Sequence, residues 1–254
     1  MTFFELGSPV KWKSSEEEFK EFVLKYNGIK NIYRSVCEYK ELSKEGKIVY
    51  ESIVLDKFFL DFDLQDYAKH GFENEDGIFE SVIKCHKFLS QKKIRHDMRF
   101  SGGGFHFFVY TKNYEKLKNP KNALDCAQKY FKNLGFIVDP QVIGDIGRVV
   151  RVPNTFNIKR GKYCVFISRE DLKKGLDHIK GLAKKQQFRQ YFYGSEFFDL
   201  APLDNGVPEQ DVLNIPDDRK RMIKDDDLLK TLPPCIANML LGGELKYRER
   251  FYVI

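Results

Sequence analysis

The sequence predicts an α+β fold: a ferredoxin-like (RRM-type) sheet with the order β-α-β-β-α-β, preceded by an αββ module and followed by a short helical tail. The main observation is the hydrophobic pattern of residues 57–139, which changes between strand and helix periodicity in that order. A second observation is that one helical segment and two β-branched, aromatic segments precede it. The third is composition, because 42% hydrophobic and 15% aromatic residues exclude a mostly disordered chain.

The N-terminal module begins with a helix at Ser14 or Ser15. Each of these serines is followed three residues later by a glutamate, which is the pattern of a capping box. Apolar residues then recur at helical spacing until Gly28. Residues 31–39 and 47–54 are predicted to be strands because they are rich in β-branched and aromatic side chains.

The split sheet is predicted from six consecutive segments. They are a strand (57–64), a helix (78–89), two strands joined by a Gly-rich turn (95–100 and 105–111), a second helix (124–134) and a short strand (136–139). In this topology the first and third strands lie side by side in the middle of the sheet, and the fourth strand pairs with the first.

The segments after the sheet are a strand at 148–152, a hairpin at 155–167 that turns at Arg160-Gly161, and a helix at 172–182. From about Pro202 the composition shifts to Asp, Pro and Lys, as in a connector. We therefore expect one domain over residues 1–200, and a connector with the beginning of a helical module over residues 201–254.

Composition and the first residues indicate the compartment. No apolar run is long enough to cross a membrane, and the start lacks the order of a secretory signal, so we expect a cytoplasmic protein without a membrane partner. Five scattered cysteines predict reduced thiols. Cys235 is either a small apolar residue that opens a helix or the first ligand of an iron–sulfur cluster completed outside this chain. The net charge of +6 suits a polyanionic partner or simply a soluble surface.

Two carboxylates, Asp61 and Asp63, share one face of the strand at 57–64, because side chains alternate along a strand. Like charges one pleat apart in an apolar strand are costly unless a cation compensates them, and hard oxygen ligands suit Mg²⁺ or Mn²⁺. The alternative is that both side chains point to water from an edge strand. Asp139 ends the fourth strand beside them and Asp145 is its rival, although a turn-capping role fits Asp145 better.

The turn formed by Ser101, Gly102 and Gly103 exposes backbone N–H groups that can cradle a phosphate, and His106 begins the next strand beside the carboxylates. The alternative is a hairpin whose glycines only satisfy a tight turn. Further on, the strand and hairpin carry cations and an amide that suit a triphosphate: Arg148, Arg151, Asn157 and Lys159. A solvated basic strand is the alternative there.

Together, LDFDL, FSGGGFH and VDPQVIGDIGRVVRVPNTFNIKRGK resemble the three motifs of the archaeo-eukaryotic primase superfamily over residues 57–163. The resemblance implies a palm sheet in which Asp61, Asp63 and Asp139 bind two divalent ions, and in which Ser101 and His106 contact the phosphates of the nucleotide together with Arg151 and Lys159. Asn157 stands where primase small subunits commonly have His. The closing LPPCIANMLLGGELKYRER is similar to the start of the helical C-terminal primase domain, and the compact arrangement favours a primase-polymerase of an archaeal plasmid or virus.

The sequence therefore leads us to expect a template-dependent nucleotidyltransferase, a DNA primase or polymerase, that uses a two-metal mechanism in DNA replication. The expected partners are a single-stranded DNA template and primer, dNTP or NTP, and further replication subunits or a C-terminal domain outside this chain. One alternative is a gap-filling or repair polymerase that extends primers but does not start them. Another is a non-catalytic accessory subunit that binds nucleic acid with the same sheet.

Overall fold

The computed structural model describes residues 3–7, 11–14 and 16–204. The chain divides into two units, Met1–Val212 and Leu213–Ile254, and all described residues lie in the first. The described part is a mixed α+β fold with several small, mainly antiparallel sheets. Residues 205–254, which include most of the predicted connector, the predicted helical module and Cys235, lie outside the described residues. None of the helices within the described ranges is long and apolar enough to cross a membrane.

The central sheet contains three long antiparallel strands, β6 (Lys57–Asp63), β7 (His96–Phe100) and β8 (Gly104–Lys112), and β8 lies between the other two. Short strands extend it: β12 (Val165–Phe166) pairs with β7, and β13 (Phe198–Asp199) pairs in parallel with the end of β8. This confirms the predicted neighbours of the first three strands, including the central place of the third.

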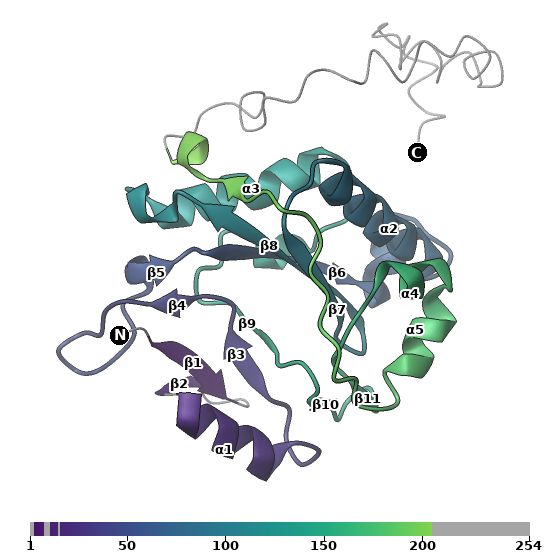
Figure 1. The fold of residues 1–254 in the computed structure, drawn as a ribbon, viewed down its shortest axis with the longest axis horizontal. Helices are drawn as coiled ribbons and strands as arrows, with labels where there is room; N and C mark the ends of the chain where they lie inside the picture. Colours follow the sequence, from purple (N-terminus) through teal and green to yellow (C-terminus); the bar gives the residue numbers. More distant parts are fainter. Residues whose placement is uncertain (1–2, 8–10, 15, 205–254) are drawn as a thin grey trace, which may run out of the picture. The chain divides into compact units, whose positions relative to one another are not determined.

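Two helices, α2 (Asp76–Gln91) and α3 (Pro120–Asn133), cover one face of this sheet (Figure 1). Along β6 the fully buried Phe58, Leu60 and Phe62 alternate with Asp61 and Asp63, as the strand period requires. The ring of Phe58 packs against Phe131 of α3 with centroids 5.7 Å apart. The helices therefore seal the apolar face of β6, and the carboxylates lie on the other face.

The predicted fourth strand is wrong, because residues 136–139 form no strand. A side chain takes its place at the edge of β6: the buried Gln128 of α3 donates from Nε2 to the carbonyl oxygen of Phe59 (2.7 Å), and its Oε1 accepts from the backbone N–H of Gly144 (2.7 Å). One backbone bond remains, from the N–H of Asp139 to the carbonyl oxygen of Asp61 (2.9 Å). The segment thus runs beside β6 as expected, although no ladder of hydrogen bonds holds it.

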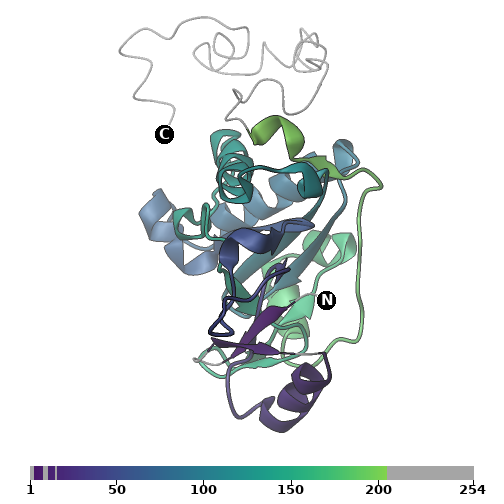
Figure 2. The ribbon, with the colours of Figure 1, turned by 90° about the vertical axis from the view of Figure 1, so that its left-hand side faces the viewer.

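A second sheet has the strand order β2-β1-β3-β9 and contains β1 (Phe4–Gly7), β2 (Lys11–Ser14), β3 (Tyr33–Ser35) and β9 (Val149–Arg151). Helix α1 (Glu16–Tyr26), predicted from its capping pattern, packs with Phe19 and Phe22 on a small core under this sheet. Figure 1 and Figure 2 both place α1 on the opposite side of the described fold from α2 and α3. The predicted strand at 148–152 therefore completes the N-terminal sheet rather than extending the central one.

The strands predicted at 31–39 and 47–54 are shorter in the structure. The first contains β3 and β4 (Glu38–Tyr39), and the second contains a 3-10 helix, η1 (Tyr50–Ser52), and β5 (Ile53–Val54), which pairs with β4. Strands β1 and β2 were not predicted, because four residues carry too few alternations to give a signal.

The remaining elements follow the central sheet. The predicted hairpin is formed by β10 (Phe156–Asn157) and β11 (Lys162–Tyr163), but the chain then leaves it, so that β12 can pair with β7. The predicted helix at 172–182 is divided into α4 (Arg169–Lys173) and α5 (Leu176–Leu182) by Gly175, whose φ of +90° cannot continue a helix. The other 3-10 helices are η2 (Leu64–His70), η3 (Tyr114–Lys116), η4 (Pro140–Val142) and η5 (Ala201–Leu203).

Candidate functional site

Three carboxylates gather at one end of β6, on the face that α2 and α3 leave uncovered. Asp61 and Asp63 lie on this face through strand alternation, and the backbone bond from Asp139 to Asp61 brings the third carboxylate to the same end. Asp63 and Asp139 each also cap a 3-10 helix, by accepting at Oδ1 from the N–H of Gln65 and of Gln141 respectively (both 2.9 Å). One oxygen of each is therefore engaged locally.

The electrostatics of Asp61 show that the three carboxylates interact. Burial raises the pKa of Asp61 to about 7, and the charges of Asp139 and Asp63 add to the increase, while Arg148 opposes it. The side chain is 24% exposed, so the group is reached by solvent only from one side. Crowded carboxylate oxygens of this kind are the donors that a hard divalent cation accepts, and a cation would relieve their repulsion.

The carboxylates do not form a tight cage in this structure. Within residues 3–7, 11–14 and 16–204, no group of three or more His, Cys, Asp or Glu side chains is gathered closely enough to hold a metal ion. The donor chemistry at Asp61, Asp63 and Asp139 therefore fits Mg²⁺ or Mn²⁺, whereas the side-chain positions are not those of a closed coordination shell.

Asp145, the rival of Asp139, is occupied elsewhere. Its Oδ1 accepts from the N–H of Gly147 (3.1 Å), and its Oδ2 pairs with Nε of Arg148 (3.1 Å). Arg148 also donates from Nη2 to the carbonyl oxygen of Gln141 (2.7 Å). Asp145 thus orients the arginine, and Asp139 is the carboxylate that lies next to Asp61.

His106 stands directly opposite Asp61 in the pairing of β6 with β8, and its Nε2 lies 3.7 Å from Oδ1 of Asp61. Burial, together with the positive charges of Arg99, Arg151 and Arg148, lowers the pKa of His106 to about 3, so the ring is neutral near pH 7. Its Nδ1 is buried without a hydrogen-bond partner in the described part of the chain. A buried polar atom of this kind is satisfied when a ligand with a matching group binds.

Of the predicted basic residues, the two arginines lie near His106, whereas the lysine lies in solvent. Arg151 is 6% exposed and donates to Oδ1 of Asn31 (3.0 Å) and to the hydroxyl of Tyr33 (2.9 Å). It also donates to the carbonyl oxygen of Phe156 (3.4 Å), which ties the N-terminal sheet to the hairpin. Arg148 and Arg151 both act on His106 through their charges. Lys159, predicted to share a strand face with Asn157, instead lies exposed in the hairpin turn, because β10 ends at Asn157.

The SGGG turn is held in a fixed shape. The N–H and the hydroxyl of Ser101 both donate to the carbonyl oxygen of Gly104 (2.9 and 3.2 Å), and Asn157 donates from Nδ2 to the carbonyl oxygen of Ser101 (3.0 Å). Gly102 has a φ of +94°, and a Cβ on Gly104 would lie 2.4 Å from the carbonyl oxygen of Phe62. The glycines therefore have structural reasons to be there, whether or not the turn also receives a phosphate.

Arg99 of β7 is a residue that the sequence analysis missed. It is paired with His106 in the sheet register, and its guanidinium forms two bonds with the fully buried Asp97, from Nε to Oδ1 (2.7 Å) and from Nη2 to Oδ2 (3.2 Å). The hydroxyl of Tyr110 donates to the same carboxylate (2.8 Å), and the guanidinium stacks on Phe108 at 3.8 Å. The sequence contained the signal for this residue. Asp97 and Arg99 lie on one face of their strand by alternation, and the predicted pairing of that strand with the next puts His106 on the same face.

The structure thus brings together Asp61, Asp63, Asp139, His106 and Arg148, with Arg99 and Arg151 close enough to influence His106 electrostatically. It holds Ser101 and Asn157 together at the adjoining turn and leaves Lys159 in solvent. The arrangement can hold a cation and, around it, an anion. Comparison of the sequence with models of known protein families and with curated proteins gives no match.

Proposed function

We propose that this chain is a template-dependent nucleotidyltransferase, a DNA primase or polymerase that starts and extends primers from nucleoside triphosphates. The observation that carries the proposal is the meeting of Asp61, Asp63 and Asp139 at one end of β6, with His106 opposite Asp61 and arginines beyond it. Negative oxygen ligands next to a group of cations are what a metal-bound triphosphate requires.

The order β6-α2-β7-β8-α3 supports a palm-like sheet as the base of the site, with Gln128 and the segment 136–139 in place of a fourth strand. In this proposal the chain adopts the palm of the archaeo-eukaryotic primases, as the three motifs suggest. The N-terminal sheet then contributes β9, which carries Arg151.

Asp61, Asp63 and Asp139 are the residues that would hold two Mg²⁺ or Mn²⁺ ions. When bound, these ions lower the pKa of the primer 3′-hydroxyl and neutralise triphosphate charge. The neutral His106 ring can donate one hydrogen bond to a phosphate oxygen, because each of its nitrogens is free of a protein hydrogen bond in the described structure.

Arg148 and Arg151 stabilise the negative charge that develops on the leaving pyrophosphate, from positions fixed by Asp145 and by Asn31 with Tyr33. The N–H groups of Gly102 and Gly103, the hydroxyl of Ser101 and the exposed Lys159 are the remaining candidates for phosphate contacts. A single-stranded template and primer, dNTP or NTP, and other replication subunits complete the proposed set of partners.

The test is incorporation of labelled dNTP and NTP on primed and unprimed single-stranded templates, with Mg²⁺ and with Mn²⁺. Asp61→Asn/Asp63→Asn should lower incorporation by about 100-fold or more, because it removes the charges that hold the cations. Asp56→Asn is a matched control, since Asp56 precedes the other end of β6 and pairs only with Lys57.

Full activity of the double variant would refute the metal assignment. Synthesis on the primed template alone would identify the protein as a primer-extending polymerase. Strand binding by the wild-type chain without incorporation under either metal ion would contradict an enzyme and favour an accessory subunit.

A further inference from the structure

A pocket of about 250 Å³ lies on the other side of the SGGG turn from the carboxylates. Its walls are Leu64, Gln65, Glu75, Phe100, Gly102, Gly103, Arg160, Lys162 and Lys180. Phe100 packs on Phe105, which in turn packs on Phe79 of α2, so this pocket belongs to the helix-covered side of the central sheet. Asp61 and Asp63 lie on the opposite face, so the pocket is separate from the carboxylates and meets the candidate nucleotide site at the glycine turn.

The charge of the pocket is positive. Arg160 and Lys162 come from the hairpin turn and β11, and neither side chain forms an ion pair or a hydrogen bond with another described residue. The third cation, Lys180 of α5, pairs with Glu75, which is the one carboxylate among the walls. Two unpaired cations therefore face a concave surface that has no anion left to balance them.

The glycine turn exposes its backbone to these cations. A Cβ on Gly103 would lie 3.2 Å from Nε of Arg160, and a Cβ on Gly102 would lie 3.3 Å from Cβ of Lys162. The hairpin thus packs on the turn with Asn157 bound to Ser101, with Lys162, the cross-strand partner of Asn157, next to Gly102, and with Arg160 next to Gly103. Bare backbone next to a guanidinium, in a pocket that a lysine also lines, is an arrangement that binds a phosphate group.

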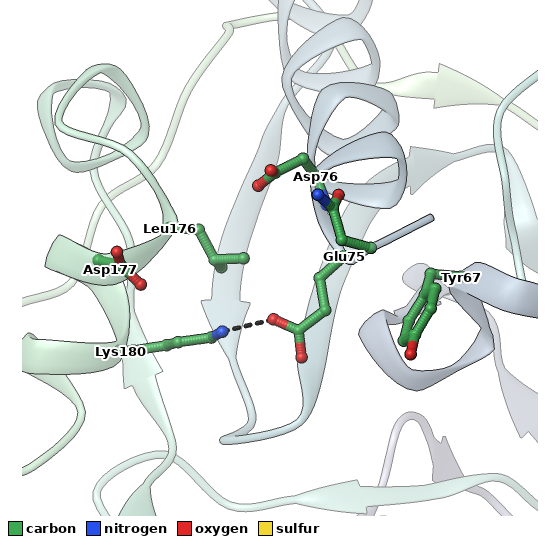
Figure 3. Close-up of a pocket in the computed structure, with 7 residues that line it drawn as sticks. Tyr67, Glu75, Asp76, Leu176, Asp177 and Lys180 are labelled. Carbon is green, nitrogen blue, oxygen red and sulfur yellow. Dashed lines mark hydrogen bonds and ion pairs between the residues drawn. The ribbon is translucent and has the colours of Figure 1, made fainter. Parts of the chain in front are cut away.

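An acidic pocket adjoins this one and limits where an anion can go. It has a volume of about 470 Å³ and is lined by Tyr67, Asn74, Glu75, Asp76, Leu176, Asp177 and Lys180. Figure 3 shows Glu75, just before α2, and Lys180 of α5 reaching toward each other, with Asp76 near Glu75 and Asp177 near Lys180. Three carboxylates and one ammonium together repel a phosphate. The Glu75–Lys180 pair therefore marks the boundary between this acidic pocket and the basic pocket formed by Arg160, Lys162 and the glycine turn.

Two further lysines follow the helix that meets the hairpin. The N–H of Tyr163, next to Lys162, donates to the carbonyl oxygen of Ala183 (2.7 Å), and this bond joins the hairpin to the end of α5. Lys184 and Lys185 follow at once and are exposed. Cations spaced along two joined segments suit a polyanion better than they suit a single small anion.

We propose that the pocket formed by Arg160, Lys162 and the Gly102-Gly103 turn binds a backbone phosphate of a single-stranded nucleic acid. The proposal rests on the nucleic-acid part of the proposed function and adds a second anchoring point, on the helix side of the turn that borders the nucleotide site. A nucleic-acid strand bound in this pocket passes the SGGG turn on the side of the central sheet that α2 and α3 cover. Its position is thereby fixed relative to the carboxylates on the other face of the sheet. A free triphosphate has the same phosphate chemistry, and the experiment separates the two sources.

The experiment measures binding of a fluorescent oligothymidylate to the full chain by anisotropy, with EDTA present so that no metal contributes. Each phosphate contact on a single strand contributes about 0.7 to the salt exponent. Loss of two contacts in Arg160→Ala/Lys162→Ala should therefore weaken binding by about 25-fold near 0.1 M salt and lower the slope of log K against log salt by about 1.4. Glu75→Gln should tighten binding by about 5-fold, because it releases Lys180 for one more contact.

Lys84→Ala/Lys129→Ala is the matched control, since it removes the same charge from exposed positions on α2 and α3 outside both pockets. Its affinity should stay within about twofold of the wild type. Unchanged affinity of Arg160→Ala/Lys162→Ala would overturn the proposal, and so would an effect confined to the KM for nucleoside triphosphate. If strand binding falls as expected but the wild type incorporates no nucleotide, the anchoring site stands and the proposed polymerase activity fails.

Discussion

Lowering the pH from 8 to 5 should destabilise the protein through two buried histidines, His86 of α2 and His96 of β7. Nδ1 of His96 lies 2.7 Å from the carbonyl oxygen of Ile94, and a carbonyl only accepts, so this nitrogen carries the proton. Nε2 of His96 therefore accepts from Nδ1 of His86 (3.0 Å), which leaves Nε2 of His86 to accept from Nε of Arg169 (3.4 Å). Both rings are neutral, and no ring nitrogen has room for a second proton.

The size of the effect follows from linkage. Burial, with the charges of His96 and Arg169, lowers the pKa of His86 from 6.5 to about 3. Burial also lowers the pKa of His96 to about 4, although its bond to the Ile94 carbonyl and the charge of Asp97 act in the opposite direction. The Tyr193 ring packs on both histidines. Because the folded pKa values are depressed, the unfolded chain takes up protons first as the pH falls below 6.5, and stability is lost from there down to about pH 4. At pH 5 each unfolded histidine gains about 2 kcal/mol from protonation and the folded one gains almost nothing, so the pair accounts for about 4 kcal/mol.

Urea unfolding at pH 8, 7, 6 and 5 measures this loss. His86→Gln should reduce the change in unfolding free energy between pH 8 and pH 5 by about 2 kcal/mol. His70→Gln is the control, because His70 is exposed. An unchanged pH dependence in His86→Gln would refute the reasoning, because the other groups with shifted pKa values in this range, Asp61 and His106, are the same in both proteins.

Three further predictions concern stability and are measured by urea unfolding. Gln128→Leu should cost about 2–4 kcal/mol, because the Phe59 carbonyl and the Gly144 N–H both lose their partner; a loss below about 1 kcal/mol would show that water replaces the side chain. Gly104→Ala should lower the free energy of unfolding by about 2–3 kcal/mol, because the new Cβ meets the Phe62 carbonyl oxygen. The control Gly181→Ala in α5, whose Cβ meets nothing within 4 Å, should leave that free energy unchanged or raise it by up to about 1 kcal/mol. Equal effects of the two variants would contradict the close contact at Gly104. Arg99→Leu should lower the free energy of unfolding by about 3–5 kcal/mol, because Asp97 keeps a buried charge without its partner. Adding Asp97→Asn should recover part of this loss, and a double variant no more stable than Arg99→Leu would refute the explanation.

The spacing of apolar residues in the sequence predicted those helices and strands that the structure forms over the same residues. The residues of β6, α2, β7, β8 and α3 have clear strand or helix periods, and their pairing followed from the β-α-β-β-α-β order. The prediction of a fourth strand was wrong. FIVD has the composition of a strand, but the side chain of Gln128 bonds to the edge of β6 where that strand would pair. A single polar residue on a helix gives no sign in the sequence of which carbonyl it will reach.

The site was predictable to the extent that it lies on strands. Asp61, Asp63 and His106 share a face because of alternation, and register places His106 opposite Asp61. Lys159 was misplaced because the hairpin turn begins after Asn157, and the sequence does not fix the length of so short a strand. The role of Arg99 depends on the bidentate pairing with Asp97 and on the stacking with Phe108, which are contacts of the folded sheet.

The pairing of β3 with β9 sets an order of events during synthesis. Arg34 pairs with Val150, so strands made early remain without their neighbour until more than a hundred further residues have left the ribosome. The contacts among β6, β7 and β8 span a much shorter stretch of chain and can close first, because a shorter loop costs less entropy. The amino-terminal sheet is therefore begun first, but its strand β9 joins only after β6, β7 and β8 have been made, and Arg151 reaches its place near His106 only then.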